Sequence, residues 1–303
     1  MGSGKIRIGL SGWSYKGWRG DFYPAVLPQK QELAYASARF PSLEINGTFY
    51  GLSTPKTMRA WYYTAPKDFV YAVKGSRFIT HNKKLNDIDE PLANFMASGI
   101  LELREKLGPI LWQLGPNLRF DAERIDRFLA LLPRDLDAVA DLAGEATLER
   151  ASARARLGAN HRVRHVIEPR HESFFVDDMV RIARNHGVAI AFSHSSAWPY
   201  TEELTAGFVY VRLHGPRALY SSGYPKPELQ EWAGRIRAWF EGSEPEDARR
   251  ITARKLPPRK HRDVYVYFDN DSGGHAPRNA AELISLLAPG RADARQRGLA
   301  EGQ

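Results

Sequence analysis

The 303-residue sequence contains no cysteine, which excludes disulfide bonds, thiolate metal sites and cysteine nucleophiles. It also lacks any apolar run close to the ~20 residues that a membrane-spanning helix requires. The first residues, Met1 to Gly4, carry no apolar stretch of the kind found in secretory signals. Gly-x-Gly-x-x-Gly and Walker patterns are absent, so no dinucleotide or nucleotide cradle is expected. These absences together predict a cytoplasmic protein that does not enter a membrane.

Negative charge is the scarcer sign, because 35 Asp and Glu stand against 43 Lys and Arg and leave a net charge of +8. This excess favours acidic partners such as phosphates, nucleic acid or anionic metabolites. A basic surface that only keeps the protein soluble is the plain alternative, since net charge says nothing about fold. Apolar residues make up 43% of the chain, which is typical of a globular protein with a large core.

Short β-rich runs alternate with longer helical stretches. Eight such runs are found at residues 6–10, 43–48, 69–74, 110–114, 165–170, 188–193, 208–214 and 264–270. Helices are expected at residues 31–40, 55–63, 91–107, 121–132, 176–186, 228–240 and 278–287. Asp121 is expected as an N-cap and Pro55 at a first helical position, and the segment after the sixth run has the poorest helical pattern. Eight strand–helix units predict an α/β fold, a single (β/α)₈ TIM-type barrel over residues 1–288.

Three segments lie outside this repeating unit. Residues 134–164 are charged and rich in alanine, and are expected to add a helix between units four and five. Residues 249–262 hold seven Lys or Arg among fourteen positions. Residues 289–303 are polar and are expected to form a frayed tail.

Polar side chains end most of the predicted strands. Strand residues alternate between two faces, and inward residues near the strand ends line the active-site mouth of such barrels. The polar residues at these ends are Glu44 and Asn46, Lys74, Gln113, Glu168 and Arg170, Arg212 and His214, and Asp269-Asn270-Asp271. They could pair with one another as a self-satisfied layer, since buried charges need partners. So many ionisable groups at six strand ends are costly to bury, however, which is more typical of a functional site.

Several motifs are typical of one known family. They occur in order along residues 6–288 and include Gly12-Trp13-Ser14-Tyr15, Glu44-Ile45-Asn46-Gly47-Thr48-Phe49-Tyr50, Glu168-Pro169-Arg170-His171, Tyr210-Val211-Arg212-Leu213-His214-Gly215 and Tyr265-Val266-Tyr267-Phe268-Asp269-Asn270-Asp271. By these motifs the chain resembles the YecE-like family, also known as domain of unknown function 72. The resemblance implies a (β/α)₈ barrel and no particular reaction. One departure is His194, where the family usually carries an aspartate, and it would alter the charge at the pocket mouth.

The first functional hypothesis is an enzyme that acts on a small anionic or phosphorylated substrate. Arg170, Arg212 and Lys74 would bind the anion, because arginine suits bidentate contacts to carboxylate or phosphate. General acid–base chemistry would then use a carboxylate as base and a histidine as acid. The candidate bases are Glu44 and Glu168, and the candidate acids are His214 and His171. The other substrate contacts would be Trp13, Tyr15, Phe49 and Tyr50 as aromatic walls, with Asn46, Gln113, His194 and Asn270.

Other classes remain open at this stage. A metal-dependent hydrolase or isomerase could draw ligands from Glu44, Glu168, His194, His214 and Asp269, although no compact ligand spacing supports it. A nucleic-acid repair protein is suggested by the net charge and by residues 249–262, which are expected at the barrel face opposite the active site. A glycosidase is disfavoured because the two glutamates fall on strands two and five, and a non-catalytic binding module is compatible with the fold. The sequence leaves the cofactor and the oligomeric state undetermined.

Overall fold

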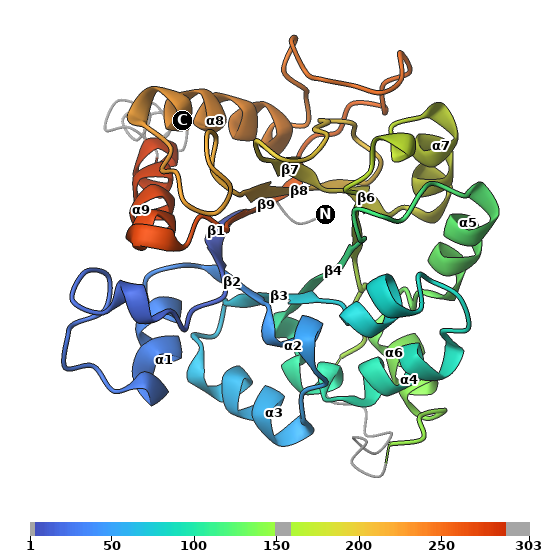
Figure 1. The fold of residues 1–303 in the computed structure, drawn as a ribbon, viewed down its shortest axis with the longest axis horizontal. Helices are drawn as coiled ribbons and strands as arrows, with labels where there is room; N and C mark the ends of the chain where they lie inside the picture. The colour runs from blue at the N-terminus through green and yellow to red at the C-terminus, as the bar shows by residue number, and fades with distance from the viewer. Residues whose placement is uncertain (1–3, 149–158, 289–303) are drawn as a thin grey trace, which may run out of the picture.

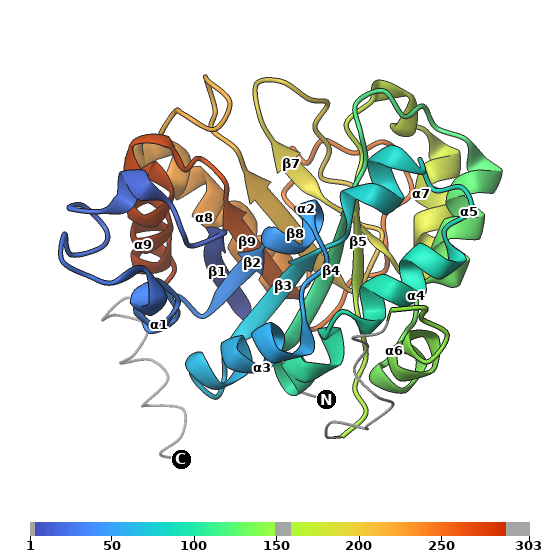
Figure 2. The ribbon, with the colours of Figure 1, turned by 60° about the horizontal axis from the view of Figure 1, so that its bottom comes forward.

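The computed structural model describes residues 4–148 and 159–288. Parallel strands form a ring that helices surround, as in a TIM barrel (Figure 1). The strands are β1 Ile6–Ser11, β2 Ser42–Ile45, β3 Val70–Lys74, β4 Leu107–Gln113, β5 His165–Glu168, β6 Ala189–Ile190, β7 Phe192–His194, β8 Phe208–Leu213 and β9 Asp263–Phe268. They are hydrogen-bonded in the order β6-β5-β4-β3-β2-β1-β9-β8-β7. Figure 2 shows the same ring turned, with the loops that follow the strands rising at one rim.

The sixth predicted strand is divided at Ala191 into β6 and β7, and this division closes the ring. β6 pairs with β5 on one side, whereas β7 pairs with β8 on the other. The N–H of Ala191 donates to the carbonyl of Ile167 (2.9 Å), so the break leaves this buried amide bonded. When β6 and β7 are counted as one interrupted strand, the eight predicted runs match the eight strands of the barrel. The predicted (β/α)₈ fold is confirmed.

The helices largely follow the predicted pattern. They are α1 Glu32–Ser37, α2 Gly47–Tyr50, α3 Pro55–Thr64, α4 Asp89–Ala97, α5 Ala122–Leu131, α6 Leu136–Ala143, α7 Asp177–His186, α8 Lys226–Phe240 and α9 His275–Leu287. Asp121 caps α5 by accepting the N–H of Arg124 (3.0 Å), as predicted. Helix α6 supplies a helix between units four and five, while residues 149–158 of that insertion and the predicted tail at 289–303 lie outside the described residues.

Two boundaries differ from the prediction. Thr48 was expected to end the second strand, but it lies in α2, where its hydroxyl donates to the carbonyl of Lys74 (2.6 Å) and joins this turn to β3. The predicted helix at residues 91–107 is broken at Gly99, whose φ of +110° ends α4 before the 3₁₀ segment Ile100–Lys106.

No helix follows β7, so the expected eighth helix of the pattern is missing from residues 195–207. Two buried carboxylates in this segment explain its path. Glu202 accepts hydrogen bonds from Arg235 of α8 (2.8 Å), and Glu203 accepts them from Arg184 of α7 (2.5 Å) and the N–H of Ile251 (2.7 Å). Because each glutamate is only 1% exposed, these donors offset the cost of burying it. Bonds to helices on both sides and to a distant segment favour an irregular path over a helix.

The basic segment at residues 249–262 lies partly on this flank of the barrel. Arg249 lies over the ring of Tyr200 (5.7 Å), and Arg184 of α7 donates to the carbonyl of Arg254 (2.8 Å). The segment was expected at the far face because it leads into β9, and the structure places its first half along α7 and beside the residues that follow β7. The carboxylates of Glu202 and Glu203 draw it alongside α7.

Replacing Glu203 with alanine is expected to lower the free energy of unfolding by about 3 kcal/mol, because Arg184 and two backbone N–H groups lose a buried acceptor. Urea unfolding would measure the loss. Glu228→Ala is the matched control, since it removes a carboxylate from a surface pair with Arg217 and should cost less than about 1 kcal/mol. Equal losses in the two variants would contradict the anchoring role of Glu203.

The barrel interior is filled by large aromatic residues on one side and small residues on the other. Tyr210 of β8 and Tyr267 of β9 are fully buried there, and the hydroxyl of Tyr267 lies 2.6 Å from that of Ser42. Gly9 of β1 pairs with Ser42, and a Cβ on Gly9 would lie 1.9 Å from the Ser42 carbonyl oxygen. This packing makes the barrel a solid core that supports a polar layer at one end.

Candidate functional site at the C-terminal mouth of the barrel

Arg212 of β8 is the centre of the polar layer, and none of its surface is exposed. Its Nε and Nη2 donate to the two oxygens of Glu44 at 3.1 and 2.8 Å. Nη1 donates to Glu168 Oε2 (3.0 Å), and Nη2 lies 2.9 Å from both Asp269 Oδ2 and Ser11 Oγ. Three carboxylates therefore converge on one guanidinium, which we call the Arg212 cluster. Its donors are taken up by these partners, so Arg212 is not available to bind a substrate anion.

The charges of the Arg212 cluster keep one another ionised. Burial alone would raise the pKa of Glu168, but Arg212 and Arg170 hold it well below its usual range. Arg212 lowers the pKa of Asp269 in the same way, against the effect of burial. Burial would lower the pKa of Arg212 itself, yet the neighbouring carboxylates, Glu44 first, raise it well above its ordinary value. Glu168 thus stays a carboxylate held by two arginines, which makes it a weak base.

Ser193, His214 and Asp269 lie in the order of a nucleophilic triad. His214 Nε2 is 3.1 Å from Ser193 Oγ, and His214 Nδ1 is 3.0 Å from Asp269 Oδ2. The hydroxyl of Ser193, however, donates to Glu168 Oε1 (2.9 Å), and only 2% of Ser193 is exposed. A hydroxyl engaged by a carboxylate and shielded in this way is not a free nucleophile. His214 instead connects two carboxylates of the Arg212 cluster.

Lys74 and Gln113 end β3 and β4 on the inner face beside this cluster, and they are 7% and 5% exposed. Lys74 Nζ lies 4.2 Å from the ring centroid of Phe49. It makes no hydrogen bond, and no ion pair within 4.0 Å, with any residue among 4–148 and 159–288. Burial, and then the charge of Arg212, lowers the pKa of Lys74 to about 8. Gln113 Oε1 is likewise buried without a hydrogen-bond partner in the described chain, so these two groups mark a place where a polar ligand would fit.

Arg170 and two loop aromatics cover the cluster on its β5 and β8 side. The Arg170 guanidinium lies 4.0 Å from the ring centroid of Trp198 and donates to Glu168 Oε1 (3.2 Å). Trp198 and Tyr220 lie edge-on to the His214 ring, at centroid distances of 6.2 and 5.6 Å. Tyr220 adopts a φ of +61°, which is uncommon for a residue with a side chain, and its N–H donates to the His214 carbonyl (2.6 Å). The loops after β7 and β8 thus form a roof of Trp198 and Tyr220.

Three predicted substrate contacts have their side chains engaged elsewhere. His194 Nδ1 lies 2.9 Å from the hydroxyl of Tyr224, and burial lowers the pKa of His194 to about 4. Asn270 donates to a side chain of α9 (3.1 Å). His171 Nδ1 accepts the N–H of Ser173 (3.1 Å) and caps a short helix. With this lowered pKa, His194 is neutral near pH 7 and adds no charge to the mouth.

Trp13 and Tyr15, two of the predicted aromatic wall residues, lie beside the site rather than over it. Trp13 packs edge-on against Trp61 at 5.2 Å, and both line a cavity of about 300 Å³ with Tyr15 and Asn46. Asn46 reaches the cluster, because its Nδ2 donates to Ser11 Oγ (2.9 Å). Asn46 thus connects this cavity to the cluster.

Phe49 and Tyr50, the other two predicted aromatic wall residues, lie in two different places. Phe49 is buried and contacts Lys74, while its ring is edge-on to that of His81 at 5.2 Å. Tyr50 is 72% exposed and lines a separate groove of about 570 Å³ with Phe78. Phe49 therefore belongs to the mouth, and Tyr50 belongs to the outer surface.

Sequence reasoning assigned Asn270, not Asp269, to the substrate, and it missed Ser11 and Ser193. A signal for Asp269 was present. Tyr267 fills the barrel interior, and alternation by two places Asp269 on that same face. Ser11 and Ser193 carry no comparable signal, because small hydroxyl side chains are common at many strand positions.

The metal alternative lacks a ligand set in this arrangement. Residues 4–148 and 159–288 contain no group of three or more His, Asp or Glu side chains that could hold a metal ion. The oxygens of Glu44 and Glu168 point at Arg212, and His194 bonds to Tyr224.

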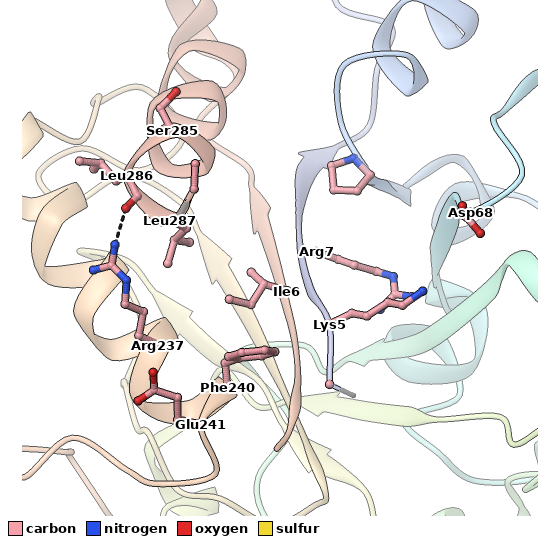
Figure 3. A pocket seen from close by; sticks show the side chains of 13 residues that line it. Lys5, Ile6, Arg7, Asp68, Arg237, Phe240, Glu241, Ser285, Leu286 and Leu287 are labelled. Atoms are coloured by element: carbon pink, nitrogen blue, oxygen red, sulfur yellow. Dashed lines mark hydrogen bonds between the residues drawn. The ribbon is translucent and has the colours of Figure 1, made fainter. Parts of the chain in front are cut away.

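A cavity of about 920 Å³ lies at the opposite end of the barrel, where β1 begins and α8 and α9 end. Figure 3 shows Lys5 and Arg7 on one wall, and Arg237 donating to the carbonyl of Leu286 on the other. Enzymes with this fold have their active sites at the C-terminal ends of the strands. We therefore place the candidate site at the Arg212 cluster.

Comparison with known proteins identifies the family. The model of a protein of unknown function, DUF72, matches residues 7–301. The chain belongs to the DUF72 family. This confirms the resemblance seen in the sequence motifs, because the YecE-like family is the same family under another name.

Similar proteins include one sequence relative and two solved structures. The UPF0759 protein YunF of Bacillus subtilis (strain 168) is 23% identical over 300 residues, which cover 93% of this chain and 94% of YunF. A DUF72 family protein of Thermotoga maritima MSB8 has a TM-score of 0.68 at 22% identity, covering 93% of this chain and 98% of that one. One from Enterococcus faecalis V583 has a TM-score of 0.64 at 16% identity, covering 93% and 95%. At these identities the solved structures show a common fold. Across the helices that the structure describes, none has the length and apolar character needed to cross a membrane.

Proposed function

We propose that this DUF72 protein is an enzyme that binds a small anionic substrate at the barrel mouth, between Lys74, Gln113 and Arg170. The observation that carries the proposal is the Lys74 ammonium, which is 7% exposed and has no carboxylate within 4.0 Å in the described chain. A buried cation without a close partner is costly, and an anionic ligand would offset that cost. Arg170 adds a second cation at the same mouth.

Proton transfer in this proposal is carried by Lys74 rather than by Glu168. An amine whose pKa is about 8 exchanges its proton close to neutral pH, as an efficient acid or base must. Glu44 and Glu168 instead hold Arg212, which in turn fixes the strand ends around the mouth. The roof of Trp198 and Tyr220 would exclude water from the bound substrate.

Phosphate, acetate and pyruvate, compared with chloride at equal ionic strength, are expected to raise the melting temperature of the wild-type protein. Occupancy at 100 times Kd would stabilise it by about 2.7 kcal/mol. Lys74→Met is expected to weaken this binding at least about tenfold, because a desolvated charge pair is lost. Arg237→Met, which removes a cation from the opposite cavity, should leave it unchanged. Calorimetric titration would give the affinities.

The affinity of the wild-type protein for these anions is expected to fall as pH rises. The anion requires protonated Lys74, so binding should be level below pH 8 and weaken about tenfold per pH unit above it. Absence of any protection by the three anions would refute the proposed function. Equal protection in wild type and Lys74→Met would refute this placement of the site.

A further inference from the structure

Two lysines are buried among residues 4–148 and 159–288, Lys74 and Lys106, and only the amine of Lys74 has no hydrogen-bond partner there. Lys106 is 5% exposed, but its Nζ donates to the carbonyls of Tyr62 (2.6 Å) and Ala65 (2.8 Å). Lys74 Nζ has the face of Phe49 as its neighbour and no acceptor among the described residues. A buried amine beside another cationic group, without a hydrogen-bond partner, is an arrangement used by lysines that act as nucleophiles.

We propose that Lys74 forms an imine with the carbonyl carbon of an anionic carbonyl compound, of which a 2-oxo acid is the simplest kind. The proposal rests on the proposed function, since it takes the same mouth as the binding site and adds the chemical class of the substrate. Arg170 and Gln113 would hold the carboxylate. Arginine binds a planar carboxylate well, and Gln113 lies on the next strand, two residues beyond the Leu111 that pairs with Lys74.

The step balances without any further reactant. The lone pair of the neutral Lys74 amine attacks the carbonyl carbon and forms a C–N bond. Both N–H hydrogens leave with the carbonyl oxygen as water, and a C=N bond remains. The imine nitrogen then takes up one proton from solvent and becomes positively charged.

The charges around Lys74 favour this product. Three carboxylates, Glu44, Glu168 and Asp269, stand against the two guanidinium groups of Arg212 and Arg170, and protonated Lys74 completes the balance. A protonated imine keeps this positive charge at the same place, whereas most modifications of an amine would remove it. Burial and Arg212 disfavour a positive charge at this nitrogen, and the carboxylates oppose them and so favour the electrophilic form that acts as an electron sink.

The lowered pKa of Lys74 supplies the reactive form. With a pKa of about 8, the neutral fraction at pH 7 is about 300 times that of an ordinary lysine. At Lys106, by contrast, the two carbonyls that accept from its nitrogen hold that nitrogen away from an electrophile.

The test is reductive trapping on the full-length wild-type protein. Pyruvate or glyoxylate is incubated with the protein at pH 7 in sodium cyanoborohydride, and the modified peptides are mapped by mass spectrometry. The peptide containing Lys74 is expected to carry the reduced adduct at least about tenfold above Lys106 and the exposed lysines. Acetone, an uncharged carbonyl, should label Lys74 far less. Excess acetate, an anion without a reactive carbonyl, should suppress labelling by pyruvate.

Two variants separate the imine from the binding site. Lys74→Arg keeps the positive charge and should retain anion protection while losing the adduct. Lys74→Met should lose both. If wild-type protein binds acetate and pyruvate but yields no adduct at Lys74, or only the exposed lysines are labelled, the imine is refuted and the proposed function stands. If no anion protects the protein, the proposed function itself is refuted.

Discussion

Replacing Arg212 with methionine is expected to lower the free energy of unfolding by about 3–5 kcal/mol at pH 7, because three carboxylates then remain in the barrel without their shared cation. The loss is comparable with the whole stability of many domains. Urea unfolding would measure it. Arg212→Lys keeps the charge but not the bidentate contact to Glu44, and it should cost less.

The pH dependence of this loss is a second readout. In the wild type, the pKa values of Glu168 and Asp269 are held low, so their contribution to stability is present above about pH 4 and is lost on acidification below that. Without Arg212, burial raises these pKa values above those of the unfolded chain. The deficit of the Arg212→Met variant should therefore shrink as pH falls from 7 towards 5.

A surface arginine provides the control for the Arg212 variants. Arg181 pairs with Asp178 at an exposed position of α7, and Arg181→Met should change stability by less than about 0.5 kcal/mol. A loss below about 1 kcal/mol for Arg212→Met at pH 7 would contradict the picture of a cluster held by one cation.

Replacing Gly9 with alanine is expected to lower the free energy of unfolding by about 3 kcal/mol or more, or to prevent folding. The added Cβ would lie 1.9 Å from the Ser42 carbonyl oxygen and 2.7 Å from its carbon. Both are backbone atoms, so the clash is relieved only by separating β1 from β2, which breaks the barrel wall. Thermal and urea unfolding would measure the effect.

Gly234 is the matched control, because it lies inside α8 with no atom within 4 Å of an added Cβ. Gly234→Ala should stabilise the protein by about 0.5–1 kcal/mol, since alanine favours the helix interior. The two glycine-to-alanine changes are thus expected to have opposite signs. A Gly9→Ala protein as stable as Gly234→Ala would contradict the close contact between β1 and β2.

Local periodicity predicted the barrel and much of its polar layer. Alternation by two correctly places Glu44, Glu168 and Arg212 on one inner face, because a side chain two residues along a strand must return to that face. The same rule applied from Tyr267 would have given Asp269 in place of Asn270. Sequence pattern therefore identifies which side chains share the inner face of the barrel, provided that the inward and outward positions of each strand are assigned correctly.

Roles within the layer were not predictable from the pattern. Arg212 was expected to bind a substrate, yet it is taken up by three acidic residues from distant strands. The missing helix after β7 has the same origin, because Glu203 is held by Arg184, 19 positions before it, and by two backbone amides that lie 48 and 49 positions after it in the chain. Long-range partners decide such features, and a local window of sequence does not contain them.

Glu202 and Glu203, which follow β7, accept hydrogen bonds from the amides of residues 249–252. This dependence affects the order in which the barrel can form during synthesis. A ribosome that has just completed β8 has already produced Glu202 and Glu203, but it has not yet produced the amides of residues 249–252 that donate to them. Until those residues emerge, burial of the two glutamates is unfavourable and this side of the nascent barrel stays open. The wall between α7 and α8 is therefore completed only late in synthesis, when the segment leading to β9 has left the ribosome.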